Sequence, residues 1–188
     1  NPDQGTPDFI VDKLKESVDN SRTHRYSSSR GIPRLRKSIC DWYERRCNVV
    51  LDPENEAIVT IGSKEGLAHL MLAVVEPGDV VIVPSPTYPI HSFGVTIAGG
   101  PLMNLPISEN DNLNVNFFDQ LRECYQRTWP RPKFLLANFP HNPTTTCVDF
   151  DFMDHLVKFA KKRGLYIIHD FAYAEIYYDG KKPLSIME

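Results

Sequence analysis

Residues 57–85 read AIVTIGSKEGLAHLMLAVVEPGDVVIVPS and contain the pattern that decides the fold. Two apolar runs rich in β-branched residues, 57–61 and 80–83, predict buried strands. The stretch between them predicts a helix, because its apolar residues recur at helical spacing: Leu67, Leu70, Met71 and Val74. Glu76-Pro77-Gly78-Asp79 supplies a turn before the second strand. The stretch is therefore a strand–helix–strand unit.

The same alternation extends outward from this unit. Further strands are predicted at 102–107, 134–137 and 165–168, and helices at 88–97, 117–127 and 150–162. Upstream, residues 7–18 and 33–46 predict two helices that flank a Ser/Arg-rich loop, 23–31. Near-continuous apolar strands that alternate with helices are typical of a mostly parallel sheet buried on both faces. We therefore expect an α/β protein, a three-layer α/β/α sandwich with its core in 57–188 and a helical lead-in in 1–50.

Composition excludes several classes of function. The chain has 188 residues, a hydrophobic fraction of 41%, a charged fraction of 24% and a formal net charge of −3. That charge does not favour nucleic acid or anionic lipid as a partner. No apolar run approaches the ~20 residues that span a membrane. Four cysteines and six histidines show no ligand spacing, so we expect no metal, and we interpret the cysteines as free thiols of a cytoplasmic protein.

Polar residues follow the predicted strands at their carboxyl ends, where open α/β sheets bind ligands. They are Ser63 and Lys64 after the first strand, Tyr88 after the second, Asn142 after the fourth, and Asp170 and Tyr173 after the fifth. A helix that begins at Ser63 offers free N–H groups to an anion. Asp170 ends an apolar strand, where a carboxylate needs a partner such as a protonated ring nitrogen. Tyr88 could stack on a planar ligand, and Tyr173 could donate to an oxygen of the same ring.

Each of these residues also has a purely structural interpretation. Ser63 and Asp170 could be helix N-caps, Tyr88 a packed loop aromatic, and Asn142 an ordinary turn asparagine. Ser85–Pro86 and Asn142–Pro143 are predicted to be cis, since both lie where the chain must turn sharply. The order of the residues at the strand ends favours the ligand interpretation.

That order resembles one known family. The matching motifs are Gly62-Ser63-Lys64, Pro86-Thr87-Tyr88-Pro89, Asn142-Pro143-Thr144, Asp170-Phe171-Ala172-Tyr173, the loop from Tyr26 to Arg36, and Asn1-Pro2-Asp3. Over essentially its whole length the chain resembles the class I/II aminotransferases of fold type I, which use pyridoxal 5'-phosphate. Within that group, IGSKEGLAHL (61–70) and YPIH (88–91) look most like bacterial alanine-forming glutamate–pyruvate transaminases and their diaminopimelate and aspartate relatives.

The resemblance implies a role for each position. Ser63 and Lys64 would bind the cofactor phosphate, and Tyr88 would stack on the pyridine ring. Asn142 and Tyr173 would hydrogen-bond the ring hydroxyl oxygen, and Asp170 would pair with the protonated ring nitrogen. Tyr26 would contact the phosphate in the neighbouring subunit of a homodimer. The substrates would be an amino acid and a 2-oxo acid.

The chain also departs from the family pattern. The Schiff-base lysine would follow Asp170 by a few dozen residues, yet only Lys181 and Lys182 follow it, in a predicted turn. The C-terminal small domain and its substrate-binding arginine are also absent. We therefore expect a fragment, inactive alone, of the cofactor-binding large domain. Two alternatives stay open: a lyase or synthase of the same fold that uses the same cofactor, and the aminotransferase-like effector domain of a transcription regulator.

Overall fold

The computed structural model describes residues 3–107 and 113–188, and within them it contains one four-stranded sheet. The strands are β1 (Val81–Ser85), β2 (Leu102–Pro106), β3 (Phe134–Asn138) and β4 (Tyr166–Asp170). All paired strands run parallel, in the order β2-β1-β3-β4. The parallel sheet predicted from the apolar runs is confirmed.

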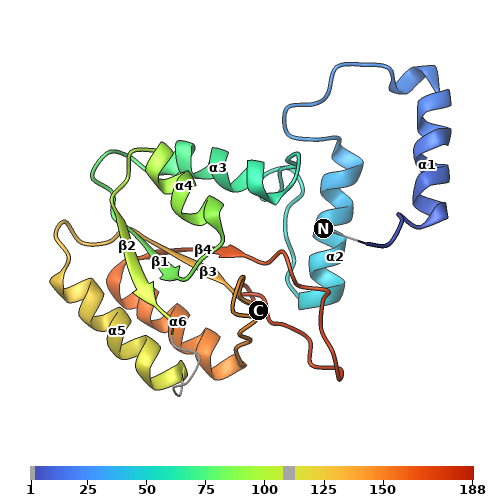
Figure 1. Ribbon diagram of the computed structural model, residues 1–188. Helices are drawn as coiled ribbons and strands as arrows, with labels where there is room; N and C mark the ends of the chain where they lie inside the picture. The colour runs from blue at the N-terminus through green and yellow to red at the C-terminus, as the bar shows by residue number, and fades with distance from the viewer. Residues whose placement is uncertain (1–2, 108–112) are drawn as a thin grey trace.

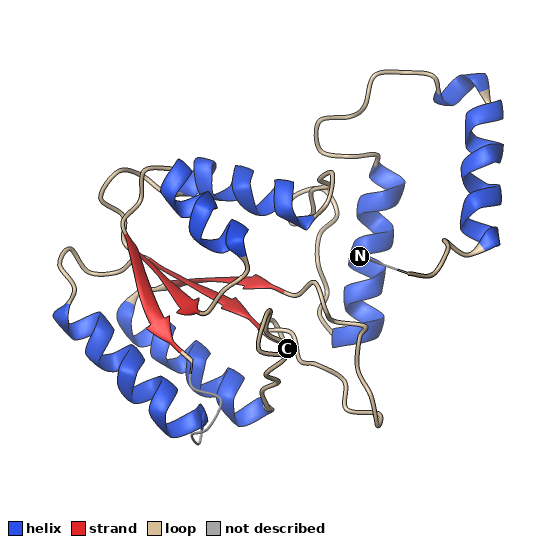
Figure 2. Ribbon diagram, in the orientation of Figure 1, coloured by secondary structure: helices blue, strands red, loops and turns tan. Residues whose placement is uncertain are grey.

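Helices cover both faces of this sheet. They are α3 (Ser63–Val74), α4 (Pro89–Ile97), α5 (Leu113–Arg127) and α6 (Phe150–Arg163). Helices α3 and α4 lie on one face, and α5 and α6 lie on the other (Figure 1). Figure 2 shows the strands as a central layer between these two pairs. The predicted three-layer sandwich is therefore confirmed.

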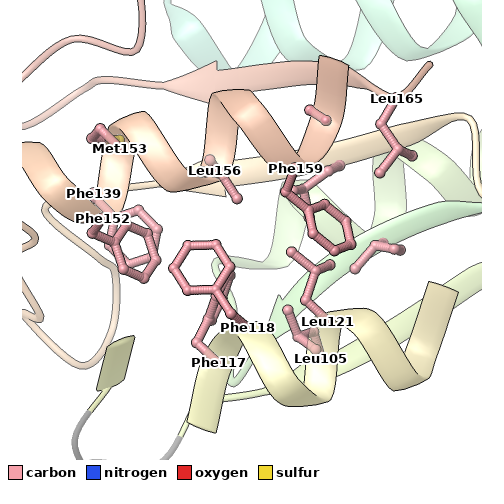
Figure 3. Packing of buried hydrophobic residues seen from close by; sticks show 14 residues of the cluster. Leu105, Phe117, Phe118, Leu121, Phe139, Phe152, Met153, Leu156, Phe159 and Leu165 are labelled. Atoms are coloured by element: carbon pink, nitrogen blue, oxygen red, sulfur yellow. The ribbon is translucent and has the colours of Figure 1, made fainter. Parts of the chain in front are cut away.

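The two central strands, β1 and β3, are buried on both faces because successive side chains point to opposite sides. Val81 and Val83 pack toward α3 and α4, whereas Ile82 packs toward α5 and α6. The larger of the two resulting cores is aromatic and lies between the sheet, α5 and α6 (Figure 3). Its aromatic members are Phe117, Phe118, Phe139, Phe152 and Phe159. Two layers of apolar packing thus hold the strand ends in place.

Chain topology creates a switch point between two strands. From β1 the chain passes through α4 to β2 on one side, and it later returns to place β3 on the other side of β1. Such a reversal leaves the carboxyl ends of the two central strands open between loops, which is where ligands bind in open α/β sheets. The segments that follow β1, β3 and β4 all lie at this edge of the sheet.

One predicted strand is wrong. Residues 57–61 belong to no strand of the described sheet. A strand needs a ladder of backbone partners, whereas Val59 N makes a single hydrogen bond, 3.1 Å long, to the carbonyl of Arg30. Ile58 and Ile61 stay exposed. The β-branched run therefore resembled a strand in composition without having a strand beside it.

The N-terminal part of the chain forms α1 (Asp8–Asp19), the short 3-10 helix η1 (Ser21–Thr23) and α2 (Pro33–Cys47). None of the residues 8–19, all of which the structure describes, is buried. Helix α2 is tied to the end of the chain, because Arg46 Nη2 donates to the carbonyls of Ala174 (3.2 Å) and Pro183 (2.9 Å). Figure 1 shows α1 standing away from the sheet on the far side of α2.

Candidate functional site

Asp170 is the last residue of β4 and lies beside Asn138, the last residue of β3. Its side chain is buried, and Oδ2 lies 2.8 Å from Nε2 of His91. The other carboxylate oxygen, Oδ1, accepts a 3.2 Å hydrogen bond from the backbone N–H of Ala172. The structural interpretation of Asp170 as a local cap therefore accounts for one oxygen only. The second oxygen is held by a residue 79 positions away in the chain.

His91 is fully buried in the first turn of α4 and joins two site segments. Because the Asp170 carboxylate accepts, Nε2 of His91 carries the proton of that bond. On the other side of the ring, Nδ1 lies 2.9 Å from Oγ1 of Thr87, so a neutral ring accepts there from the hydroxyl. Sequence reasoning did not include His91 in the site. The feature of the sequence that could have identified His91 is its position four residues after Thr87, at the start of a predicted helix.

Asn142 and Tyr173 are brought together from two different loops. Nδ2 of Asn142 donates to the Tyr173 hydroxyl oxygen at 3.0 Å. An ordinary turn asparagine would bond its own neighbouring backbone, so this contact favours a shared role for the pair. The peptide bonds Ser85–Pro86 and Asn142–Pro143 are cis, as predicted, and so are two that were not predicted, Trp129–Pro130 and Phe139–Pro140.

Asn138 links the two loops and was also missed. Its Nδ2 donates to the carbonyl of Asp170 at 3.0 Å, and its Oδ1 accepts from the backbone N–H of Asn142 at 3.0 Å. It is 2% exposed, so both halves of a buried amide are satisfied by the site backbone. A polar residue that closes the apolar run FLLAN was the sequence signal.

Ser63 and Lys64 begin α3 next to Tyr88. Gly62, at φ +84°, is the N-cap residue, so Ser63 is the first helical residue and its interpretation as the N-cap is wrong. The first N–H groups of a helix have no partner within it. Lys64 Nζ lies 5.4 Å from the centroid of the Tyr88 ring, a cation–π distance. An anion near this turn would meet free N–H groups, a hydroxyl and an ammonium.

A continuous series of contacts thus connects the residues predicted for the core of the site. In order, it passes through Lys64, Tyr88, His91, Asp170, Asn138, Asn142 and Tyr173. The Tyr88 and His91 rings meet edge to face with centroids 5.8 Å apart. Two predicted site residues are outside this series: Ser63, which directly precedes Lys64 at the start of α3, and Tyr26. Tyr26 is fully exposed on the loop before α2, so within a single subunit it is not part of this series.

Two further histidines lie near the site and are held neutral. His141 directly precedes Asn142, is 2% exposed, and pairs through Nδ1 with the Thr144 hydroxyl at 2.8 Å. Burial, and then the neighbouring His91, lower the pKa of His141 to about 4. Burial likewise lowers the pKa of His169, next to Asp170, to about 4. At neutral pH both imidazoles are therefore uncharged.

These side chains can bind a flat, phosphorylated, cationic ring. A buried carboxylate suits a protonated ring nitrogen, an amide–phenol pair suits a ring oxygen, an aromatic face suits stacking, and a helix start with a lysine suits a phosphate. Among the described residues no group of His, Cys, Asp and Glu is arranged to bind a metal. In the same ranges, no helix is long and apolar enough to cross a membrane.

The fold and these motifs are those of the pyridoxal-phosphate-dependent transferases, and the chain belongs to the family "Aminotransferase class I and II", whose model matches residues 1–187. Pyridoxal 5'-phosphate is the cofactor of this family. The resemblance read from the motifs is confirmed.

Two similar proteins carry aminotransferase names, in agreement with this family. The chain is 50% identical over 188 residues to "Glutamate-pyruvate aminotransferase AlaC" of Escherichia coli (strain K12), covering all of this chain and 45% of that protein. It is 38% identical to "LL-diaminopimelate aminotransferase" of Oleidesulfovibrio alaskensis, covering 47% of that protein.

Solved structures match as well. Substrate-bound BacF from Bacillus subtilis superposes with a TM-score of 0.89 at 34% identity, covering 100% of this chain and 46% of BacF. An aromatic aminotransferase from Pyrococcus horikoshii OT3 superposes with a TM-score of 0.90 at 27% identity, covering 100% of this chain and 49% of that one. The chain spans about half the length of the proteins it matches.

Proposed function

We propose that a full-length protein carrying this chain transfers an amino group between an amino acid and a 2-oxo acid of the alanine, glutamate or aspartate type. The observation that carries this proposal is Asp170, a buried carboxylate at the end of β4 whose second oxygen is held by His91 at 2.8 Å. Two aminotransferase names among the relatives support it over a lyase, a synthase or the effector domain of a regulator.

When bound, pyridoxal phosphate supplies a protonated ring that accepts the electron pair released as the substrate's α-proton leaves. Asp170 would hold the proton on the ring nitrogen through its carboxylate. His91, held in turn by Thr87, orients that carboxylate by donating from Nε2. At the other end of the site, Ser63 and Lys64 would bind the cofactor phosphate.

The remaining residues would position the ring and the substrate. Tyr173 and Asn142, already paired at 3.0 Å, would share the ring hydroxyl oxygen, and Asn142 could also reach the substrate carboxylate. Tyr88 would cover one face of the ring. Tyr26 would serve the phosphate of the neighbouring subunit, which makes the working enzyme a homodimer in this proposal.

The test of the proposed function is Asp170→Ala in the full-length protein. Truncating one member of a buried charge pair costs ~2–5 kcal/mol, which corresponds to a loss of roughly 30-fold to several thousand-fold in α-proton abstraction. Asp170→Glu should recover part of the rate, because it keeps the charge and changes only the reach. Single-turnover abstraction and thermal melting are measured on the same sample. Normal abstraction with a lowered melting temperature would show that Asp170 is only a structural cap.

A second test concerns the covalent anchor. Lys181 and Lys182 are exposed and lie beside a turn in which Asp179 and Gly180 have φ values of 55° and 70°. A catalytic lysine must be held against the cofactor, so we expect chain 1–188 alone to acquire no stoichiometric label at one lysine. Incubation with pyridoxal phosphate, borohydride reduction and peptide mapping measure this. Full labelling of a single lysine contradicts the proposal that this chain lacks the anchor.

A further inference from the structure

Arg36 on α2 is a buried cation that holds two separate stretches of the chain. Its side chain is 4% exposed, and all three guanidinium nitrogens are used. Nη1 donates to the carbonyl of Gly31 at 2.6 Å, and Nε donates to the carbonyl of Pro53 at 2.8 Å. Nη2 lies 2.9 Å from both carboxylate oxygens of Glu54. The guanidinium therefore ties the end of the loop before α2 to the turn at 52–56.

Arg30 adds a second set of bonds between the same two stretches. Its Nη1 donates to the carbonyl of Glu54 at 2.8 Å, and Nη2 lies 3.3 Å from the Glu54 carboxylate. The backbone carbonyl of Arg30 accepts from Val59 N at 3.1 Å. Gly31 has φ +82°, and a Cβ there would meet Val59 Cγ2 at 2.3 Å, so only glycine permits this close approach. We call Arg30, Gly31, Arg36, Glu54 and Val59 the arginine clamp.

The clamp joins the two chain segments that carry the residues placed on phosphates in the proposed function, Tyr26 and Ser63. Arg30 follows Tyr26 by four positions, and Val59 precedes Ser63 by four. Beyond the clamp, Ile61 N donates to Glu65 of α3 at 2.9 Å, so the connection continues into the turn that presents Ser63. The other end of the Tyr26 loop is also held, because His24 Nε2 contacts the carbonyl of Val18 at 2.7 Å. Tyr26 itself is exposed between these two anchors.

We propose that Arg36 is a positioning residue for the phosphate end of the cofactor, acting through the arginine clamp on Tyr26 and Ser63. This inference rests on the proposed function, in which Ser63 serves the subunit's own site and Tyr26 serves its neighbour's. Holding a loop in its binding conformation raises affinity by lowering the cost of ordering it on binding. Because one clamp holds both segments, a change at Arg36 affects the phosphate contacts of both sites.

The experiment compares two ligands that differ only in the phosphate. The full-length protein, stripped of cofactor, is titrated with pyridoxal phosphate and with pyridoxal. The quantity measured is the ratio of the pyridoxal dissociation constant to the pyridoxal phosphate dissociation constant, which falls when phosphate binding alone is weakened. Arg36→Met should weaken pyridoxal phosphate by on the order of tenfold to hundredfold and leave pyridoxal unchanged. Arg34→Met is the matched control, because Arg34 is exposed on the same helix and lies outside the clamp. It should leave the ratio unchanged.

A double variant tests the route of the effect. Tyr26→Phe removes only the hydroxyl and should weaken pyridoxal phosphate by about tenfold. If the clamp acts through Tyr26, Arg36→Met combined with Tyr26→Phe costs less than the product of the two single effects. If Arg36→Met fails to fold, Glu54→Gln is titrated in its place. This variant should fold, because the Glu54 side chain is 58% exposed and the substitution keeps its size. A lowered ratio supports the clamp, and an unchanged ratio overturns it.

The two proposals fail in different ways. If the unmodified protein binds pyridoxal phosphate no better than pyridoxal, the proposed function is wrong and the inference falls with it. If the unmodified protein prefers the phosphate and Tyr26→Phe reduces that preference, the site stands. In that case equal losses for both ligands in Arg36→Met, or no loss at all, show that Arg36 serves the fold alone.

Discussion

In the α/β core, residues 81–173, the site side chains hold one another, whereas residues 3–62 present Tyr26 from an exposed loop that is held only at its ends. Asp170, His91, Asn138 and Asn142 form hydrogen bonds of 2.8–3.0 Å among themselves above two apolar cores. The N-terminal part relies instead on the polar arginine clamp. Hydrogen bonds above packed apolar cores therefore fix the ring-binding end of the site, while the charged hydrogen bonds of the clamp join the Tyr26 loop to the segment before Ser63.

The aromatic core and the exposed helix α1 should differ most in what they contribute to stability. Phe152 is 1% exposed in the aromatic core, and Leu14 on α1 has the opposite environment, at 65% exposed. We expect Phe152→Ala to cost ~3–5 kcal/mol of unfolding free energy and Leu14→Ala less than ~0.5 kcal/mol. Chemical denaturation of the full-length variants measures both. A cost for Leu14→Ala as large as that for Phe152→Ala would mean that α1 is buried in the complete protein.

The next prediction concerns how the unfolding free energy depends on pH through His141, a buried residue of the α/β core. The pKa of His141 is lowered from 6.5 to about 4 by burial, so between these values the unfolded chain binds a proton that the folded chain does not. Stability from this histidine is fully present above pH 6.5 and is lost as pH falls toward 4. The slope of unfolding free energy against pH in that window should be ~1.4 kcal/mol per unit for this group.

His141→Gln tests that slope, because the amide keeps a polar group beside Thr144 and cannot titrate. We expect the acid side of the stability curve to become shallower by about one proton. His169, with its pKa also lowered to about 4 by burial, continues to contribute its own part of the slope. An unchanged slope in His141→Gln would mean that His141 titrates in the folded protein at its ordinary pKa.

A smaller change in stability is expected at Thr145, in the loop after β3. Thr145 has φ +60°, a left-handed conformation that is costly for a β-branched residue. Thr145→Gly should remove that strain, offset in part by the greater flexibility of glycine in the unfolded chain, for a net gain of up to about 1 kcal/mol. Thermal melting measures it. A loss of stability would show that the Thr145 side chain makes a contribution larger than its backbone cost.

Most of the core could be predicted from the sequence because its information is local. Apolar runs, helical spacing and the polar residues at the strand ends located β1–β4, the helices and Asp170, Asn142 and Tyr173. His91 and Asn138 were missed for a common reason. A histidine inside a helix start and an asparagine at the end of an apolar run are chemically unremarkable until long-range packing gives them partners 79 and 32 residues away.

The sequence by itself determined the alternation of strands and helices, the family and the residue types at the strand ends, since each depends on neighbours within a few positions. The tertiary structure decided which of these residues touch. Residues 57–61 form no strand of the described sheet, because a strand needs a partner that no local pattern can specify. The tertiary structure also joined Arg30 and Arg36 to Glu54, because a buried charge is stable only where folding brings its counter-charge and carbonyls to it.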